Sequence, residues 1–108
     1  MKTILISGCA GFIGQNLIAR LIDKNKIIGI DNLYSSNFAS LDNFKKIKNF
    51  EFIKKSIIDI PEIDSEIDII INLACPASPP LYQKDPIFTL DTNYIGTKTL
   101  LELARKKS

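Results

Sequence analysis

The sequence contains no histidine in its 108 residues, which removes the most common general base and a frequent zinc ligand. Acid–base chemistry by histidine is therefore excluded, and no metal site is expected. The only two cysteines, Cys9 and Cys75, are too few to form a disulfide framework. We therefore expect reduced thiols and a cytoplasmic protein.

Strong net charge and long apolar runs are also missing. The net charge of +2 gives no reason to expect binding to nucleic acid or to a membrane surface. No apolar run has the length needed to span a bilayer, and the chain starts directly with a strand pattern, so we expect neither a membrane segment nor a signal peptide. The basic clusters at 45–48 and 105–107 are interpreted as solvated helix surface and helix C-terminus. The length is that of one small domain, residues 1–108.

The most informative segment is Gly8-Cys9-Ala10-Gly11-Phe12-Ile13-Gly14, which follows an apolar run and precedes a helical pattern. A strand that enters a glycine-rich turn and then a helix N-terminus presents backbone N–H groups to a pyrophosphate. In this interpretation Gly8 permits the tight exit from the strand. Gly11 lets a phosphate approach the backbone, and Gly14 lets the helix pack closely on the sheet. The spacing is G-x-x-G-x-x-G rather than the commoner G-x-G-x-x-G.

An acid, Asp31, closes the second predicted strand. A carboxylate at this position can accept hydrogen bonds from the ribose hydroxyls of an adenosine, whereas a 2′-phosphate would be repelled. No arginine lies in the residues that follow, 32–37. The pattern therefore predicts NAD rather than NADP as the cofactor. The alternative is that Asp31 only caps a turn with Asn32.

The periodicity of apolar residues predicts an α/β fold of the Rossmann type, a parallel sheet with helices on both faces. The alternation of elements favours right-handed crossovers and the strand order 3-2-1-4, with a ligand crevice where strands one and four diverge. The apolar sequence of strand four is typical of a strand covered on both faces of the sheet. In a chain of this length we expect strand four to form an unpaired edge of the sheet. The expected strands are 3–7, 26–31, 50–53 and 67–73; the expected helices are 12–24, 38–47 and 86–106; and a proline-rich loop is expected at 75–85.

The last of these helices carries a stripe of apolar positions, which we expect to pack against the rest of the domain. Pro86 fits its first turn, where a missing N–H costs nothing. The stripe consists of Ile87, Leu90, Tyr94, Thr97, Leu101 and Ala104.

The run Asn72-Leu73-Ala74-Cys75-Pro76-Ala77-Ser78-Pro79-Pro80, together with Thr92-Asn93 and Gly96-Thr97, closely resembles the UDP-glucuronate decarboxylases, or UDP-xylose synthases. These enzymes belong to the extended short-chain dehydrogenase/reductases, the NAD-dependent nucleotide-sugar epimerases and dehydratases. The glycine segment and Asp31-Asn32-Leu33 fit the wider family. The resemblance covers the whole chain but only the first half of such an enzyme, so strand five onward and the substrate domain are absent.

The resemblance implies that NAD is retained while the sugar C4 hydroxyl is oxidised, CO₂ is lost and the ketone is reduced. By this likeness the glycines hold the pyrophosphate together with backbone N–H groups of Phe12 and Ile13, and Asp31 and Asn32 take the adenosine ribose. The residues implied to bind NAD are Gly8, Gly11, Phe12, Ile13, Gly14, Asp31, Asn32, Ser56, Ile57, Leu73, Cys75 and Thr92. The implied substrate of the complete enzyme is a nucleotide sugar.

Several positions depart from the family pattern. Ser56 stands where the family usually has an acid that contacts the adenine amine, and Asn72 stands where histidine is common. Asp91 replaces a lysine of the substrate-binding decarboxylases, and Thr99 replaces an asparagine. A carboxylate at position 91 would repel the anionic UDP-glucuronate.

The catalytic Tyr-x-x-x-Lys pair of the family lies beyond strand four, so no catalytic residue is predicted here. Tyr94 and Lys98 match its spacing, but they lie one helix too early, and we interpret the match as coincidence. The chain therefore reads as the cofactor part of a UDP-glucuronate decarboxylase-like enzyme. The alternatives are another sugar-nucleotide epimerase or 4,6-dehydratase, a non-catalytic dinucleotide-binding module, and a remnant without function. The expected partner is a second copy of the chain or a complementing C-terminal polypeptide.

Overall fold

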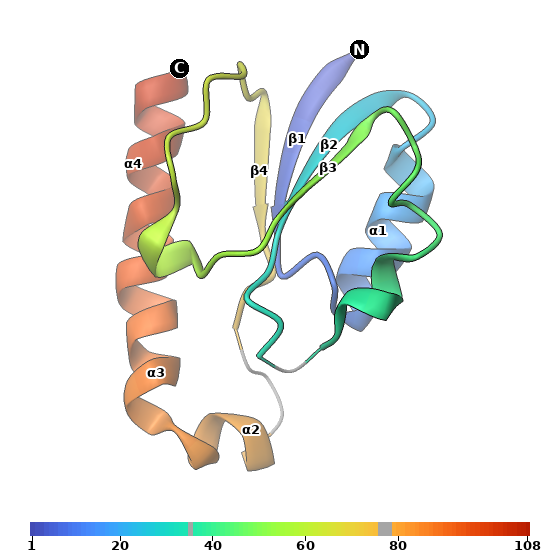
Figure 1. Ribbon diagram of the computed structural model, residues 1–108. Helices are drawn as coiled ribbons and strands as arrows, with labels where there is room; N and C mark the ends of the chain where they lie inside the picture. Colours follow the sequence, from blue (N-terminus) through green and yellow to red (C-terminus); the bar gives the residue numbers. More distant parts are fainter. Residues whose placement is uncertain (35, 76–78) are drawn as a thin grey trace.

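The computed structural model describes residues 1–34, 36–75 and 79–108. Its centre is a sheet of four parallel strands in the order β3-β2-β1-β4, shown in Figure 1. The strands are β1 (Lys2–Ser7), β2 (Asn25–Ile30), β3 (Phe50–Ile53) and β4 (Ile69–Asn72). The predicted strand order is thus confirmed.

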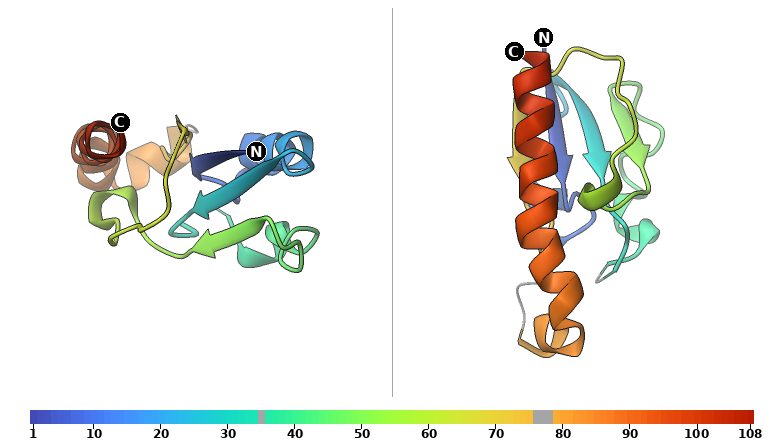
Figure 2. Two further views of the ribbon diagram at one scale, coloured as in Figure 1. Left: turned by 90° about the horizontal axis from the view of Figure 1, so that it is seen from above. Right: turned by 90° about the vertical axis from the view of Figure 1, so that its left-hand side faces the viewer.

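The central strands are buried on both faces because helices cover the sheet on its two sides. Side chains alternate across β1, so that Ile4 and Ile6 join one core while Leu5 joins the other. Helix α1 (Phe12–Leu21) covers the first face, and the long C-terminal helix covers the second (Figure 2). The first core also holds Ile18, Ile22, Ile27, Leu41 and Phe44; the second holds Ile28, Ile30, Ile57, Ile63, Ile67 and Leu100.

Three predicted boundaries are wrong. Helix α1 ends at Leu21 rather than at residue 24, because the Asn25 side chain donates to the Leu21 carbonyl (2.9 Å) and β2 begins there. The helix expected at 38–47 is the short 3₁₀ helix η1 (Phe38–Leu41) followed by hydrogen-bonded turns. The strand expected at 67–73 is shorter, and Ile69 is exposed because β4 lies at the edge of the sheet. It is therefore not covered on both faces.

The proline-rich segment 75–85 contains a helix, α2 (Pro79–Lys84), that the sequence pattern did not predict. Prolines are compatible with the first turn of a helix, so their presence at its start does not exclude one. Residues 76–78, which carry part of the family resemblance, lie outside the described residues. Pro86 does begin a helix, and the Asp85 side chain caps it by accepting from the Phe88 N–H (3.0 Å).

The long C-terminal helix contains a π-helical segment that changes which residues face inward. It runs as α3 (Pro86–Asp91), the π segment η3 (Thr92–Gly96) and α4 (Thr97–Lys107). A π turn shifts the register of the helix faces. The buried residues of η3 and α4 are accordingly Thr92, Gly96 and Leu100.

The expectation that the apolar stripe packs against the domain is wrong. Ile87, Leu90, Tyr94 and Leu101 are 72%, 65%, 66% and 66% exposed. They lie on the outer face of the helix, whose buried residues are Thr92, Gly96 and Leu100.

Within residues 1–34, 36–75 and 79–108, no helix has the length and apolar character needed to cross a membrane. The same residues contain no group of three or more histidine, cysteine or acidic residues placed to hold a metal ion.

Candidate functional site

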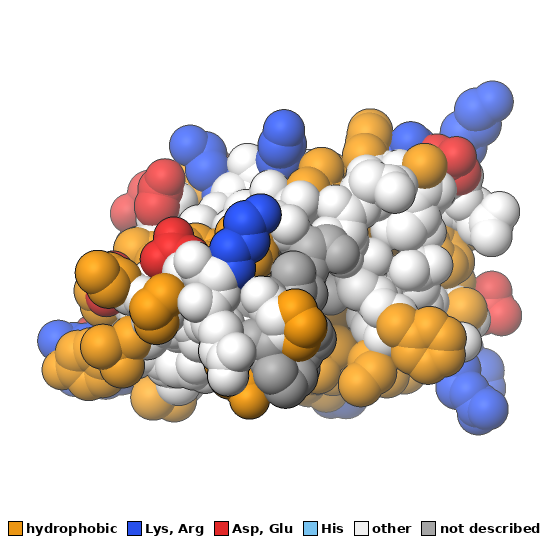
Figure 3. All heavy atoms as spheres, turned by 90° about the horizontal axis from the view of Figure 1, so that it is seen from below, with side chains coloured by type: hydrophobic (Ala, Val, Ile, Leu, Met, Phe, Trp, Pro, Cys, Tyr) orange, Lys and Arg blue, Asp and Glu red, His pale blue; other side chains and the backbone are white. Residues whose placement is uncertain are grey.

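A cavity of about 370 Å³ lies at the carboxyl ends of the strands, between the glycine-rich turn and the long C-terminal helix. Figure 3 looks onto this end of the molecule: apolar side chains gather at its margins, and backbone and uncharged polar atoms occupy much of its centre. All twelve residues predicted from the sequence line this one cavity. Six further lining residues were not predicted: Ile30, Tyr34, Ser36, Lys55, Ala74 and Phe88.

Gly8 and Gly14 are required by the packing of the chain itself. Gly8 has a φ of +69°, and a Cβ there would lie 2.5 Å from the Leu73 carbonyl oxygen. A Cβ on Gly14 would lie 2.6 Å from the Gly8 oxygen and 2.7 Å from the Cys9 Cα. These contacts agree with the tight turn and the close helix packing that the sequence predicts.

Gly11 is different, because no atom of residues 1–34, 36–75 and 79–108 crowds the space in front of it. Among these residues, the atoms nearest to a Cβ at this position would be the Gly8 oxygen at 3.4 Å, which is a tolerable contact, and the Ser36 Oγ at 4.0 Å. The position lines the cavity, so the missing side chain leaves room for a group from outside the chain.

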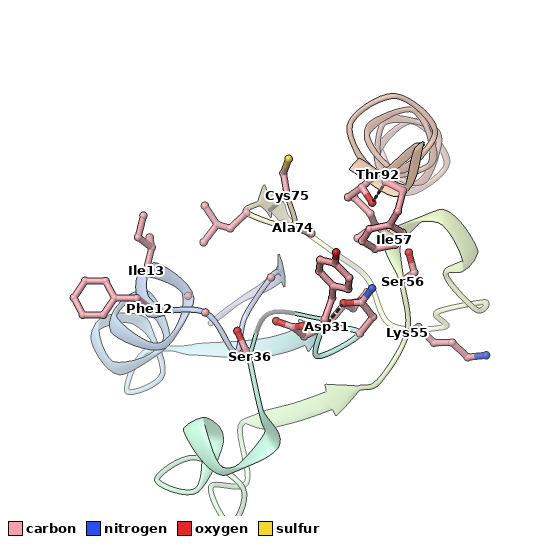
Figure 4. Close-up of a pocket in the computed structure, with 18 residues that line it drawn as sticks. Phe12, Ile13, Asp31, Ser36, Lys55, Ser56, Ile57, Ala74, Cys75 and Thr92 are labelled. Carbon is pink, nitrogen blue, oxygen red and sulfur yellow. Dashed lines mark hydrogen bonds between the residues drawn. The ribbon is translucent and has the colours of Figure 1, made fainter. Parts of the chain in front are cut away.

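Helix α1 begins at the same point without a capping side chain. Its N-cap is Gly11, which provides no side-chain hydrogen bond, and its first turn contains no acid. The first N–H groups of a helix have no partner within the helix and attract an anion. Figure 4 shows the Phe12 and Ile13 side chains pointing away from the centre of the cavity, so these two residues offer it their backbone. The site therefore fits a phosphate group.

Asp31 follows β2 and joins two loops beside the cavity. Its Oδ2 accepts from the Ala10 N–H (3.0 Å), and its Oδ1 accepts from the Leu33 N–H (2.7 Å). The carboxylate thus closes a turn, as the alternative interpretation expected, and also lines the cavity. Each carboxylate oxygen can accept a second hydrogen bond, so both roles are compatible.

The residues after Asp31 are held in a fixed conformation. Leu33 adopts a φ of +63°, and the Asn32 side chain accepts from the Tyr34 N–H (3.0 Å). This arrangement places the Tyr34 ring 4.8 Å from the Phe88 ring of α3, centroid to centroid. Two lining residues from different parts of the chain therefore meet beside the cavity. Tyr34 could have been suspected from its closeness to Asp31 in sequence, whereas nothing in the sequence pattern pointed to Phe88.

Cys9, in the glycine-rich turn, is buried among the apolar residues of the core that contains Ile4 and Ile6. Burial raises the pKa of its thiol to about 12, and the nearby Asp31 carboxylate adds to the effect. Cys9 is therefore an unreactive thiol. Cys75 is exposed and lines the cavity.

Beyond β3, Ser56 caps the short 3₁₀ helix η2 (Ile57–Asp59) by accepting from the Ile58 N–H (3.2 Å). The Nζ of the neighbouring Lys55 lies 3.9 Å from the Oδ2 of Asp59. Figure 4 shows the Lys55 ammonium group pointing away from Asp31. Ser56 keeps its hydroxyl proton for another partner, because that hydrogen bond uses only a lone pair.

The far wall of the cavity comes from the end of β4 and from the π segment. Asn72 accepts from the Ser7 hydroxyl (2.6 Å) and from the Ala74 N–H (3.1 Å), which fixes the backbone leading to Cys75. The Thr92 hydroxyl donates to the Phe88 carbonyl (2.8 Å), so towards a ligand it can only accept.

The remaining positions singled out from the sequence do not reach the cavity. Tyr94, Lys98, Asp91 and Thr99 are not among its lining residues. The Thr99 hydroxyl donates to the Ile95 carbonyl within the helix (2.8 Å). The Tyr94–Lys98 pair is thus not placed as a catalytic pair of this cavity.

Comparison with known proteins gives a consistent result. The model of the GDP-mannose 4,6 dehydratase family matches residues 5–108. UDP-glucuronic acid decarboxylase 5 of Arabidopsis thaliana is 44% identical over an alignment 108 residues long. The alignment covers 95% of this chain and 30% of the relative. The sequence resemblance is confirmed, but the chain spans about 30% of the length of that curated relative and not the expected half.

Solved structures share the fold. The UDP-N-acetylglucosamine 4-epimerase from Methanobrevibacter ruminantium M1, in complex with UDP-N-acetylmuramic acid, has a TM-score of 0.87 and 30% identity, and the match covers 98% of this chain and 34% of the epimerase. The enzyme WbmF of Bordetella bronchiseptica, in complex with NAD+, has a TM-score of 0.85 and 24% identity; the match covers 99% of this chain and 33% of WbmF. Because the family match includes almost every residue and the fold agrees with it, the chain belongs to the GDP-mannose 4,6-dehydratase family of nucleotide-sugar epimerases and dehydratases.

Proposed function

We propose that residues 1–108 form the NAD-binding portion of a nucleotide-sugar-modifying enzyme. One observation carries this proposal: the space in front of Gly11 is open, and the uncapped N-terminus of α1 begins there. A dinucleotide supplies the anion that such a site favours. The twelve residues implied by the family likeness all line the same cavity, which supports the proposal further.

In the proposed complex the pyrophosphate lies against the backbone of Gly11, Phe12 and Ile13. The adenosine ribose lies at Asp31, whose oxygens have lone pairs left to accept its hydroxyl groups. Thr92, at the far wall, faces a ligand group that donates, such as a hydroxyl or an amide. When bound, NAD supplies a hydride acceptor that can oxidise a sugar hydroxyl and later return the hydride.

We expect the chain to prefer NAD to NADP by roughly tenfold in dissociation constant, because a 2′-phosphate would meet the Asp31 carboxylate. Titration calorimetry with both cofactors measures this preference. Asp31→Asn should reduce the preference, since it removes the charge and keeps an oxygen for one of the two N–H groups. Asp64→Asn, an exposed acid outside the cavity, is the matched control. Tighter binding of NADP than of NAD by the unaltered chain would reject the role given to Asp31.

We further propose that the complete enzyme is a UDP-glucuronate decarboxylase. The support is the identity with the decarboxylase of Arabidopsis thaliana. Tyr94 is two-thirds exposed and does not line the cavity, so we expect residues 1–108 with NAD to release no labelled CO₂ from UDP-glucuronate. Adding the C-terminal part of a related decarboxylase should restore release. Release by the chain alone that disappears in Tyr94→Phe would contradict this assignment.

Asp91 favours a second candidate, another epimerase or 4,6-dehydratase, because its carboxylate suits an uncharged sugar better than a glucuronate. The similarity to the Methanobrevibacter ruminantium epimerase is compatible with that candidate. The complementation experiment, run with UDP-glucose and with UDP-glucuronate and read out by chromatography of the sugar nucleotides instead of CO₂ release, separates the two.

A further inference from the structure

Gly96 lies outside the cavity, yet it contacts one of the residues that line it. An ideal Cβ on Gly96 would lie 2.3 Å from the Ile57 Cδ1 and 2.4 Å from its Cγ1. Atoms do not approach so closely, so the π segment can rest on η2 only because residue 96 has no side chain. The backbone of Gly96 is helical, a conformation that any residue can adopt, so its φ and ψ do not require a glycine. What requires a glycine at position 96 is the close contact between the π segment and η2.

Ile57 has little freedom to move away from such a side chain. It is 2% exposed and packs in the second core with neighbours that include Leu5, Ile30 and Leu100. Its β-branched side chain also has few allowed rotamers. On the core side the space is filled, and the remaining open side is the cavity, which Ile57 lines.

The other way to relieve the contact is to move the helix. The π segment that holds Gly96 also holds Thr92, and α3, immediately before it, holds Phe88. Both residues line the cavity, and Figure 4 shows Thr92 beside Ile57 on the wall opposite Phe12 and Ile13. A displacement of the helix would therefore carry this wall outward. Either response changes the shape of the cavity.

We propose that Gly96 is a positioning residue for the dinucleotide site: its missing side chain lets the π segment rest on Ile57 and so fixes Ile57 and Thr92 in place on the far wall. This inference rests on the proposed binding of NAD. Gly96 contacts no ligand in this account and acts through Ile57.

Enlarging residue 96 and shortening residue 57 tests the inference. Gly96→Ala should weaken NAD binding by about tenfold, a typical strength for coupling between residues in contact. Adding Ile57→Ala to it removes the Cγ1 and Cδ1 atoms and leaves the Ile57 Cβ at 3.6 Å, an ordinary contact. The double variant should therefore bind NAD more tightly than Gly96→Ala alone. Asn93→Ala, an exposed change in the same π segment, is the matched control and should bind like the unaltered chain.

The recovery shows that the effect of Gly96→Ala passes through its contact with Ile57, because a large-to-small change in the core would otherwise lower stability further. Binding by Gly96→Ala equal to that of the unaltered chain would overturn the inference, and so would a double variant that binds no better than Gly96→Ala. If circular dichroism shows that Gly96→Ala does not fold, the double variant is compared with Ile57→Ala. It must then bind at least as tightly, and weaker binding overturns the inference.

A measurement without ligand separates this inference from the proposed function. In amide NMR spectra of the free protein, Gly96→Ala should shift the resonances of Thr92 and Phe88 and leave that of Gly11 in place. The double variant should return them towards their original positions. If the unaltered chain binds no NAD, the proposed function fails, and these shifts alone decide the positioning role: their absence in Gly96→Ala would refute it.

Discussion

At Gly8, Gly11 and Gly14 one residue type meets two different requirements. The first and last accommodate neighbouring backbone, with Cβ positions 2.5 Å and 2.6 Å from carbonyl oxygens, whereas the middle one faces open space. The sequence predicted the packing roles of Gly8 and Gly14 from the strand–turn–helix context, and the approach of a phosphate to Gly11 stays a prediction. The sequence could not predict that Asp31 also binds the Ala10 and Leu33 N–H groups, because hydrogen bonds between loops depend on tertiary structure.

Cys9 gives a residue-scale prediction about pH. Its pKa rises from 9.0 in the unfolded chain to about 12 in the fold, so the stabilisation is complete below pH 9. As the pH rises from 9 towards 12, the unfolded chain releases this proton first, and stability falls by roughly 1 kcal/mol per pH unit. Urea unfolding across this range should show a steeper fall for the unaltered chain than for Cys9→Ala. Parallel curves would show that burial of the thiol does not affect stability.

Among the elements, the strands were predicted well and the helices poorly. A parallel sheet covered on both sides requires near-continuous apolar runs, which Ile4–Ile6 and 27–30 provide, so their order followed from chain connectivity. Counting apolar residues at a period of 3.6 cannot detect the π segment Thr92–Gly96, which shifts the helix register. The inward face was therefore assigned to Leu90 and Tyr94, while the structure buries Thr92 and Gly96.

For the whole molecule, the exposure of the stripe leaves an apolar surface on the C-terminal helix. The surface consists of Ile87, Leu90, Tyr94 and Leu101, and α3 extends it beyond the sheet (Figure 1). Apolar patches of this kind mark association surfaces. The edge strand β4, with Ile69 exposed, lies on the same side of the molecule as α4.

We expect the chain to self-associate through this surface, so its average mass in sedimentation experiments should rise with concentration. The double variant Leu90→Glu/Leu101→Glu should remain monomeric, because charge on this face opposes its burial. Lys98→Glu, an exposed change on the same helix, is the control and should behave like the unaltered chain. An unaltered chain that stays monomeric at every concentration would contradict the expectation.

The central claim is that the open space at Gly11 receives a dinucleotide, and one titration tests it most directly. NAD binding by Gly11→Val is compared with that of the unaltered chain, with circular dichroism as the check on folding. Position 11 has an extended backbone with a φ of −75° and an open environment, so the variant should fold. Its branched side chain would occupy the place of the pyrophosphate and abolish binding. A folded Gly11→Val chain that binds NAD as tightly as the unaltered one would contradict the account.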